Sequence, residues 1–382
     1  MIETQFTGLY LDWIAFLCDS TFFVYIHCIH DTDTPLLQQR KYTIRVRIQR
    51  FFDIVRMSSL FFILLVIGNL IVRQSNATVV TTTTKCYPPL EVYVVDLDLA
   101  PEDRWTALAK KKKTELLALL DALDVLIGGS VADDLVNATN ATMSDEYRKE
   151  ISGIANAIDA KFNRVLMANI YYEISGVGDT SLDLSRSCTS IVAQRSNGTV
   201  YLARNQDYPP PFELVQVHLQ FERNGTLLFQ GTGFAGTIGL ATGTRTSTSP
   251  QGNEEGWAVS INARGNPAKG TSNGVQAAIE SARRGASIFP LITREAFQVA
   301  RTYKEAMKYL SSKDLIMEGY IIVGGSSPGE GAIVTRNASG AETNLLSLFD
   351  PAGSDEGGGD WYVCQTNTDH FDVAPSTPDS TW

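Results

Sequence analysis

The chain has 382 residues, enough for one large domain or two smaller ones with a substantial buried core. Hydrophobic residues make up 44% and charged residues 19%, which is the composition of an ordinary globular protein. The net charge of −10 argues against nucleic acid as the main partner. Five cysteines are too few for a disulfide scaffold, and because the number is odd, at least one has no partner within the chain.

The N-terminal region contains a segment with the anatomy of a signal peptide. A basic run precedes an apolar core from Leu60 to Val72, and small residues follow it. This core is shorter than the roughly 20 residues that span a membrane. Because Met57 directly precedes the core, we expect translation to begin there, with residues 57–77 as the signal peptide and 1–56 as an upstream extension. The alternative is an uncleaved signal anchor with a cytosolic tail.

Asn-x-Ser/Thr sequons support a secretory route. They begin at Asn76, Asn137, Asn140, Asn197, Asn224 and Asn337. Such sequons are acceptors for N-linked glycans in secreted proteins. Together with the acidic balance of charge, they predict a glycoprotein that is lysosomal or secreted.

The segment after the Thr-rich linker Thr78–Thr84 has a helical pattern. A short strand in "EVYVVD" precedes a helix that starts near Pro101 and stops at Gly128. A second helix, from Ser144 to about Ile174, carries apolar residues at three- and four-residue spacing. The basic run "KKKK" in the first helix is either a solvated face or a docking patch for an anionic membrane.

From Cys188 the pattern changes from helical to alternating. Strands are predicted for "TSIVAQ", "TVYLARNQ", "VQVHLQFE", "TLLFQGT", "GWAVSINAR", "GYIIVGG", "GAIVTRN" and "WYVCQTN". Asn224-Gly225 between two of these runs is a strong hairpin signal. Two helices are expected near 272–285 and 290–311, the second opened by Pro290. This order predicts a layered α+β fold.

Cys188 is a lone thiol directly before the first of these strands. It could be a buried structural residue, or it could form a disulfide with Cys86 or Cys364. It could also be a nucleophile, which requires a base to take its proton. Histidine is the usual base. His218 lies in the middle of a predicted strand, as an ordinary half-exposed residue would, but His370 could be the base of a Cys–His hydrolase.

Another base exists if the bond between Ser187 and Cys188 is cut. Cys188 would then carry a free α-amino group, with a pKa of about 7.7–8.0 in model compounds. This amine lies close to its own thiol and can accept the thiol proton, as in N-terminal nucleophiles. In that case no histidine is needed.

"CTSIVAQ" followed by "ARNQDY" closely resembles the start of the mature β-subunit in the acid ceramidase and N-acylethanolamine acid amidase family. These are N-terminal nucleophile hydrolases related to bile-salt and penicillin V acylases. "VVDLDLAPEDRW", "FAGTIGLATG", "YIIVGGSSPGEGAIVTRN" and "WYVCQTNTDHF" resemble further family segments in the family's order. The resemblance covers about Cys86 to Phe371.

The resemblance implies a four-layer αββα sandwich made as a precursor. Residues 78–187 would form a helical α-chain, separated by self-cleavage, and residues 188–382 the catalytic β-chain. The two would remain together as a heterodimer. No metal or cofactor is implied.

The resemblance also implies roles for four residues. Cys188 would attack the preceding carbonyl and then act as the nucleophile toward a lipid amide. Arg204 would keep the site electropositive, and Asp207 would hold the new α-ammonium. Asn367 would donate to the oxyanion of the tetrahedral intermediate. The bland alternative is an ion pair between Arg204 and Asp207 at a strand end, with Asn367 as a turn residue.

The implied activity is hydrolysis of an N-acylated lipid, either ceramide or an N-acylethanolamine, to a fatty acid and an amine. A membrane surface or a lipid-presenting protein would deliver the substrate. Two departures favour the alternative of a non-catalytic lipid-binding homologue. Ala263 stands where the family has a functional Glu, and the chain stops at Trp382 before an Asp-Asp-Arg-Arg element and the final strands.

Overall fold

The computed structural model describes residues 11–18, 21–28, 89–127, 129–177, 188–208, 210–246, 255–264, 272–338, 342–348 and 361–369. The chain divides into two compact units, Met1–Pro89 and Leu90–Trp382. In the first unit, β1 (Leu11–Cys18) and β2 (Thr21–Cys28) form an antiparallel hairpin. The predicted signal peptide, Ser187 and His370 lie outside the described residues.

The second unit is built on an eight-stranded sheet with the order β12-β11-β10-β9-β8-β7-β6-β3. Its strands are β3 (Val92–Asp96), β6 (Gln216–Arg223), β7 (Thr226–Phe234), β8 (Thr242–Arg245), β9 (Trp257–Ala263), β10 (Gly319–Gly325), β11 (Gly331–Arg336) and β12 (Glu342–Ser347). All neighbours are antiparallel except β3 and β6, which are parallel.

The β6–β7 hairpin shows how the sequence specifies this sheet. Asn224 and Gly225 have φ angles of 50° and 66°. Two consecutive positive φ angles are what a type I′ turn requires, so the Asn-Gly prediction is confirmed. On β6 every second residue is buried: Val217, Leu219 and Phe221. The alternation therefore directs one face of the strand into the core.

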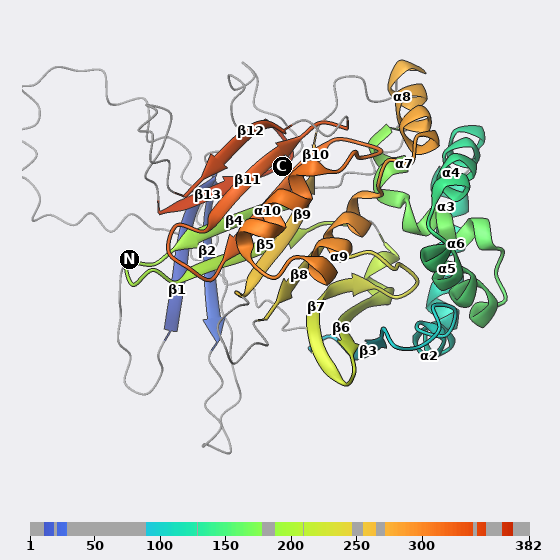
Figure 1. Ribbon diagram of the computed structural model, residues 1–382, viewed down its shortest axis with the longest axis horizontal. Coiled ribbons are helices and arrows are strands. Elements are labelled where there is room, and N and C mark those ends of the chain that lie inside the picture. Colours follow the sequence, from blue (N-terminus) through green and yellow to red (C-terminus); the bar gives the residue numbers. More distant parts are fainter. Residues whose placement is uncertain are drawn as a thin grey trace, which may run out of the picture. The chain divides into compact units, whose positions relative to one another are not determined.

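A second sheet has three strands in the order β13-β4-β5. They are β4 (Cys188–Gln194), β5 (Val200–Gln206) and β13 (Tyr362–Gln365). This sheet packs against β9, β10 and β11 of the larger sheet, so that two β layers face each other (Figure 1). The central position of β4 explains why it is buried along nearly its whole length.

Two helices cover the other face of the larger sheet, α9 (Phe289–Val299) and α10 (Tyr303–Ser312). A further helix, α8 (Ser272–Arg283), contacts α4 and α7. The helix α9 contacts β7, β8 and β9, and α10 contacts β10. Stacked rings of Phe221, Phe229, Phe297 and Trp257 join α9 to the sheet, at centroid distances of 4.4, 5.3 and 4.4 Å. The α+β prediction is therefore confirmed, with three of the expected layers among the described residues.

The segment before Cys188 forms a cluster of helices at one end of the larger sheet (Figure 1). They are α2 (Thr106–Lys111), α3 (Lys113–Ile127), α4 (Ser130–Thr142), α5 (Asp145–Ile158), α6 (Phe162–Asn169) and α7 (Tyr171–Val177). They belong to the same compact unit as the strands. The change of pattern at Cys188 is thus no boundary between compact units.

Helices form where they were predicted, but each predicted long helix is divided into two or three shorter ones. The first expected helix is interrupted at Lys112, and the second is three helices, because Asp159 adopts a left-handed conformation (φ 59°) that ends α5. The helix expected over 290–311 is divided into α9 and α10, and Thr302 caps the second by accepting from the amide of Glu305 at 3.2 Å. The elements α4, β8 and β12 were not predicted.

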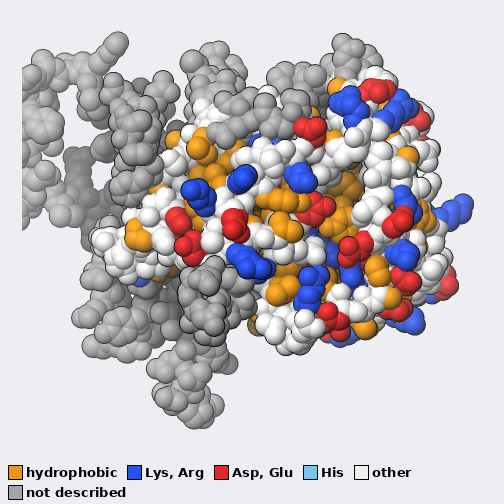
Figure 2. Space-filling view, viewed as in Figure 1, with side chains coloured by type: hydrophobic (Ala, Val, Ile, Leu, Met, Phe, Trp, Pro, Cys, Tyr) orange, Lys and Arg blue, Asp and Glu red, His pale blue; other side chains and the backbone are white. Residues whose placement is uncertain are grey.

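The run of lysines lies on an exposed helical face where most charges are paired. Lys111 bonds to Glu91 and Lys113 to Asp159, and Lys112 lies 3.7 Å from Glu115. Basic and acidic side chains are interspersed on the face seen in Figure 2. These pairs favour the solvated face over the membrane-docking patch. Within the described ranges, no helix has the length and apolarity needed to cross a membrane.

Candidate active site

Cys188 opens β4 and is buried with a free thiol. Its strand is paired on one side with β5, where Gln206 lies directly opposite Cys188, and on the other with β13. Cys364, on β13, is disulfide-bonded. The alternative of a disulfide at Cys188 is therefore wrong, because this thiol is free.

Arg204 holds its guanidinium beside the sulfur. Its Nη2 lies 3.4 Å from Sγ of Cys188 and donates to the carbonyl of Ile261 at 2.6 Å. Its Nη1 donates to the carbonyl of Ala241 at 3.0 Å and to Oγ1 of Thr242 at 2.5 Å. Three acceptors from the larger sheet and its loops thus fix a permanent positive charge next to the thiol.

Asn367 contacts the backbone of the same cysteine. The backbone nitrogen of Cys188 donates to Oδ1 of Asn367 at 2.7 Å. The Nδ2 of Asn367 donates to the carbonyl of Ala263 at 2.6 Å. Asn367 follows β13, so the pairing of β13 with β4 brings this side chain to the start of β4. This bond uses one of the two hydrogens on Nδ2.

Asp207 directly follows Gln206, the residue opposite Cys188, but its carboxylate bonds to another side chain. It is exposed, and its two carboxylate oxygens accept from Nδ2 of Asn205 at 2.9 and 3.1 Å. It forms no ion pair with Arg204, although both residues are described, so the strand-end ion pair is wrong. His218 lies on β6, where its ring contacts Gln230 at 3.1 Å, as expected for a half-buried strand residue.

A buried polar network links β4, β9 and β13 next to the site, and it was not predicted from the sequence. Asn262 is fully buried; its Oδ1 accepts from Ser190 and its Nδ2 donates to the carbonyl of Gln365, at 2.7 and 2.8 Å. Ser260 donates to Ser190 at 2.9 Å. The signal was available, because polar residues at alternate positions of "VSINAR" lie on one face of a strand.

The loop that carries Asn367 is held at its far end by an ion pair. Arg264 donates from Nε and Nη2 to the two carboxylate oxygens of Asp369, at 2.7 and 2.6 Å. The hydroxyl of Tyr320 also donates to Asp369, at 2.6 Å. Glu318 lies 3.7 Å from Arg264. Burial raises the pKa of Glu318, and the charge of Arg264 only partly opposes this.

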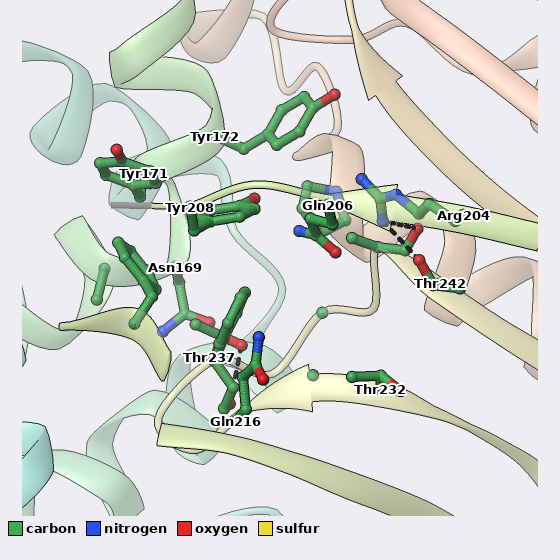
Figure 3. A pocket seen from close by; sticks show the side chains of 17 residues that line it. Asn169, Tyr171, Tyr172, Arg204, Gln206, Tyr208, Gln216, Thr232, Thr237 and Thr242 are labelled. Carbon is green, nitrogen blue, oxygen red and sulfur yellow. Dashed lines mark hydrogen bonds between the residues drawn. The ribbon is translucent and has the colours of Figure 1, made fainter. Parts of the chain in front are cut away.

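A pocket of about 240 Å³ adjoins the site (Figure 3). Its wall includes Tyr171 and Tyr172 from the segment before Cys188, and Arg204, Gln206 and Thr242 from the segment after it. Cys188 does not line the pocket, so Arg204 connects the cavity to the sulfur. Among the described residues, no group of three or more His, Cys, Asp or Glu side chains could hold a metal ion.

Comparison with known proteins identifies the chain's relatives. Residues 88–149 match the family model described as the beta subunit of N-acylethanolamine-hydrolyzing acid amidase, although they lie before Cys188, in the segment predicted to be the α-chain. The N-acylethanolamine-hydrolyzing acid amidase of Oryctolagus cuniculus is 30% identical over 316 residues, which cover 78% of this chain and 76% of the rabbit protein.

Two further relatives have the same or a related name. Acid ceramidase of Balaenoptera acutorostrata scammoni is 25% identical over 308 residues, covering 74% of this chain and 71% of that protein. The solved structure of the Caenorhabditis elegans N-acylethanolamine-hydrolyzing acid amidase ortholog is 29% identical and has a TM-score of 0.40, covering 48% of this chain and 70% of that chain. From the identity and coverage of the rabbit protein, the chain belongs to the N-acyl lipid amidase family of the acid ceramidases and N-acylethanolamine-hydrolyzing acid amidases.

Proposed function

We propose that the chain cleaves itself between Ser187 and Cys188 and then hydrolyses the amide bond of N-acylated lipids with the Cys188 thiol. One observation supports this most directly. The sulfur of Cys188 contacts Arg204 at 3.4 Å, and its backbone nitrogen contacts Asn367 at 2.7 Å. An N-terminal nucleophile needs both atoms of this residue, the sulfur to attack and the nitrogen to take the proton.

Self-cleavage would begin with attack of the sulfur on the carbonyl carbon of Ser187. The acyl group moves from nitrogen to sulfur, which frees the α-amine and leaves a thioester. Water hydrolyses the thioester, releasing the carboxyl end of the first chain and restoring the thiol of Cys188. The positive charge of Arg204 lies where negative charge develops on sulfur.

In the lipid reaction, the α-amine of Cys188 would accept the thiol proton, and the thiolate would attack the amide carbonyl. The tetrahedral intermediate collapses to a thioester as the amine leaves with a proton, and water then releases the fatty acid. Asn367 donates one Nδ2 hydrogen to the carbonyl of Ala263, and its second Nδ2 hydrogen would serve the oxyanion. Asp207 would need to turn from Asn205 to meet the new α-ammonium.

The proposed substrates are ceramides and N-acylethanolamines, because the relatives are named for both. A two-chain form agrees with the word subunit in the description of the matching family model. We further propose a lysosomal or secreted location, and delivery of the substrate by a membrane surface or a lipid-presenting protein.

Intact-mass analysis of the purified full chain at mildly acidic pH tests the proposal. We expect a new chain that begins with Cys188, together with hydrolysis of an N-acyl lipid. Cys188→Ala should stay uncut and inactive, whereas His370→Ala should be processed and active. Cleavage or turnover by Cys188→Ala would contradict the proposal, and an inactive but folded His370→Ala protein would favour a Cys–His hydrolase.

A non-catalytic lipid-binding homologue is the second candidate. Ala263 favours it, because a small apolar side chain, buried in the core, stands where a functional Glu is expected. An uncut chain that binds N-acyl amides without hydrolysing them would support this candidate.

A further inference from the structure

Gln206 faces the pocket from the strand next to the nucleophile. It is directly opposite Cys188 in the β4–β5 register, and residues opposite each other in an antiparallel pair lie on the same face of the sheet. It also lines the pocket beside Arg204. Figure 3 shows the amides of Gln206 and Gln216 pointing into the cavity from two different strands.

The amide of Gln206 has a donor without an acceptor. Its Nε2 is buried and forms no hydrogen bond within the described residues. The Nε of Arg204, another residue of the pocket wall, is buried and unpaired in the same way. A buried donor that has lost water and gained no partner is unfavourable. The pocket is therefore short of hydrogen-bond acceptors next to the reactive sulfur.

The opposite part of the wall is aromatic. Tyr208 contacts Tyr171, Phe212 and Phe234, with ring centroids 5.8, 4.9 and 5.0 Å apart. These rings fit an aliphatic group, whereas Gln206 fits an oxygen. The pocket is thus suited to an amphipathic molecule with its polar atom at the end nearest Cys188.

We propose that Gln206 determines specificity by donating a hydrogen bond from Nε2 to an oxygen that the substrate carries close to its scissile amide. The inference rests on the proposed amidase function and narrows its substrate class to N-acyl amides with such an oxygen. The oxygen belongs to a hydroxyl of the amine part or of the acyl part. A site with an unpaired donor discriminates against analogues that lack the acceptor.

Ligand binding to the full chain with Cys188→Ala tests this inference without any turnover. The probes are N-octanoylethanolamine, N-octanoylpropylamine and N-(2-hydroxyoctanoyl)propylamine, which differ in where a hydroxyl is placed or in lacking one. We expect one hydroxylated probe to bind roughly 5- to 150-fold more tightly than N-octanoylpropylamine in calorimetry. Which probe is preferred assigns the oxygen to the amine or the acyl part.

Adding Gln206→Met should remove this preference, because methionine keeps the length of the side chain but has no donor. Gln206→Leu, which has neither a donor nor an acceptor, should also remove it and serves if the methionine variant does not fold. Gln276→Met, on the exposed face of α8, is the matched control and should keep it.

No binding of any probe, no preference for a hydroxyl, or a preference that survives both Gln206 variants would overturn the inference. Turnover of N-acyl amides by the chain with Cys188 intact is measured separately. If a preference that depends on Gln206 appears in an inactive chain, the proposed function fails and the role of Gln206 in binding stands. If the chain is active and the probes bind equally, only the role of Gln206 fails.

Discussion

Arg204 reaches four partners with two nitrogens, and this geometry depends on a planar guanidinium. Lysine has one compact ammonium group and cannot bond Ile261, Ala241 and Thr242 while also contacting sulfur. We expect Arg204→Lys to lower kcat for lipid hydrolysis by about 10²-fold or more, as the loss of one preorganised electrostatic group typically does. Steady-state kinetics on the processed enzyme would measure this, with circular dichroism as the check on folding. An unchanged kcat would mean that only the charge at this position matters.

Asn262 positions the residues on either side of the site through its hydrogen bonds. It joins Ser190, two positions after Cys188, to the carbonyl of Gln365, two positions before Asn367. Asn262→Leu leaves buried polar groups without partners, so we expect a loss of about 1–3 kcal/mol in the free energy of unfolding. Denaturant titration would measure it. Ser190→Ala removes one partner of the same network and should cost less; a larger loss from Ser190→Ala would contradict this account.

At the scale of elements, α5 and α9 are joined by a buried ion pair. Arg294 donates to both carboxylate oxygens of Glu150, at 2.6 and 2.8 Å, and both side chains are fully buried. Trp105 and Arg104 also donate to Glu150, at 2.7 and 2.8 Å. Glu150 lies before the proposed cleavage site and Arg294 after it. This cluster would therefore hold the two chains together after cleavage.

Removing one side chain of this ion pair should lower the free energy of unfolding more than replacing both side chains. Glu150→Ala leaves the charge of Arg294 buried and unpaired, and we expect a loss of about 3–5 kcal/mol in the free energy of unfolding. The double variant Glu150→Ala with Arg294→Met should be closer to the parent chain. Denaturant unfolding of both variants tests this; additive losses would show that the two side chains act independently.

The ion pair between Glu150 and Arg294 should stay intact in mild acid, because the carboxylate of Glu150 stays ionised. Burial alone would raise the pKa of Glu150, but the charge of Arg294 and hydrogen bonds from Arg294, Trp105 and Arg104 lower it below 4.5. A carboxyl with a lowered folded-state pKa stabilises the fold above its unfolded value, and this is lost as pH falls through the folded value. The stability lost in Glu150→Gln should therefore be similar at pH values above 4.5 and diminish below that value. Thermal unfolding across this range would measure it, and a loss that grew on acidification would contradict the assignment.

Strands were easier to predict than helix ends, because strands have local sequence signals and these helix ends depend on packing. Alternation and Asn-Gly turns are local signals, so β4 to β7 were found from sequence. Breaks at Lys112 and Asp159 have no Gly or Pro beside them, and they depend on packing between helices. For the site, Cys188 was marked by its position, but its contact with Asn367 depends on strand pairing over 179 residues, which only the family resemblance suggested.

For the whole molecule, the stability that Glu318 contributes changes with pH in the opposite direction to that of Glu150. Burial raises the pKa of Glu318 above 4.5, Arg264 opposes the rise, and Asp369 adds to it. The folded state then binds more protons than the unfolded state, so the stability contributed falls as pH rises through the folded pKa. Glu318→Gln cannot ionise. We expect the Tm of this variant relative to the parent to become more positive from acidic to neutral pH.

Thermal unfolding of both proteins over this pH range would measure the difference. A Tm difference that became more negative toward neutral pH would show that the ion pair between Glu318 and Arg264, at 3.7 Å, outweighs burial. Glu280→Gln, at a half-exposed position of α8, is the control and should show no such trend.

The contact between the backbone nitrogen of Cys188 and Asn367 joins positions 179 residues apart. A ribosome must therefore translate as far as Asn367 before the backbone of Cys188 can meet this partner. The proposed self-cleavage would therefore wait for translation of Asn367, and a polypeptide released by a stop codon before that position would have Cys188 but not this partner.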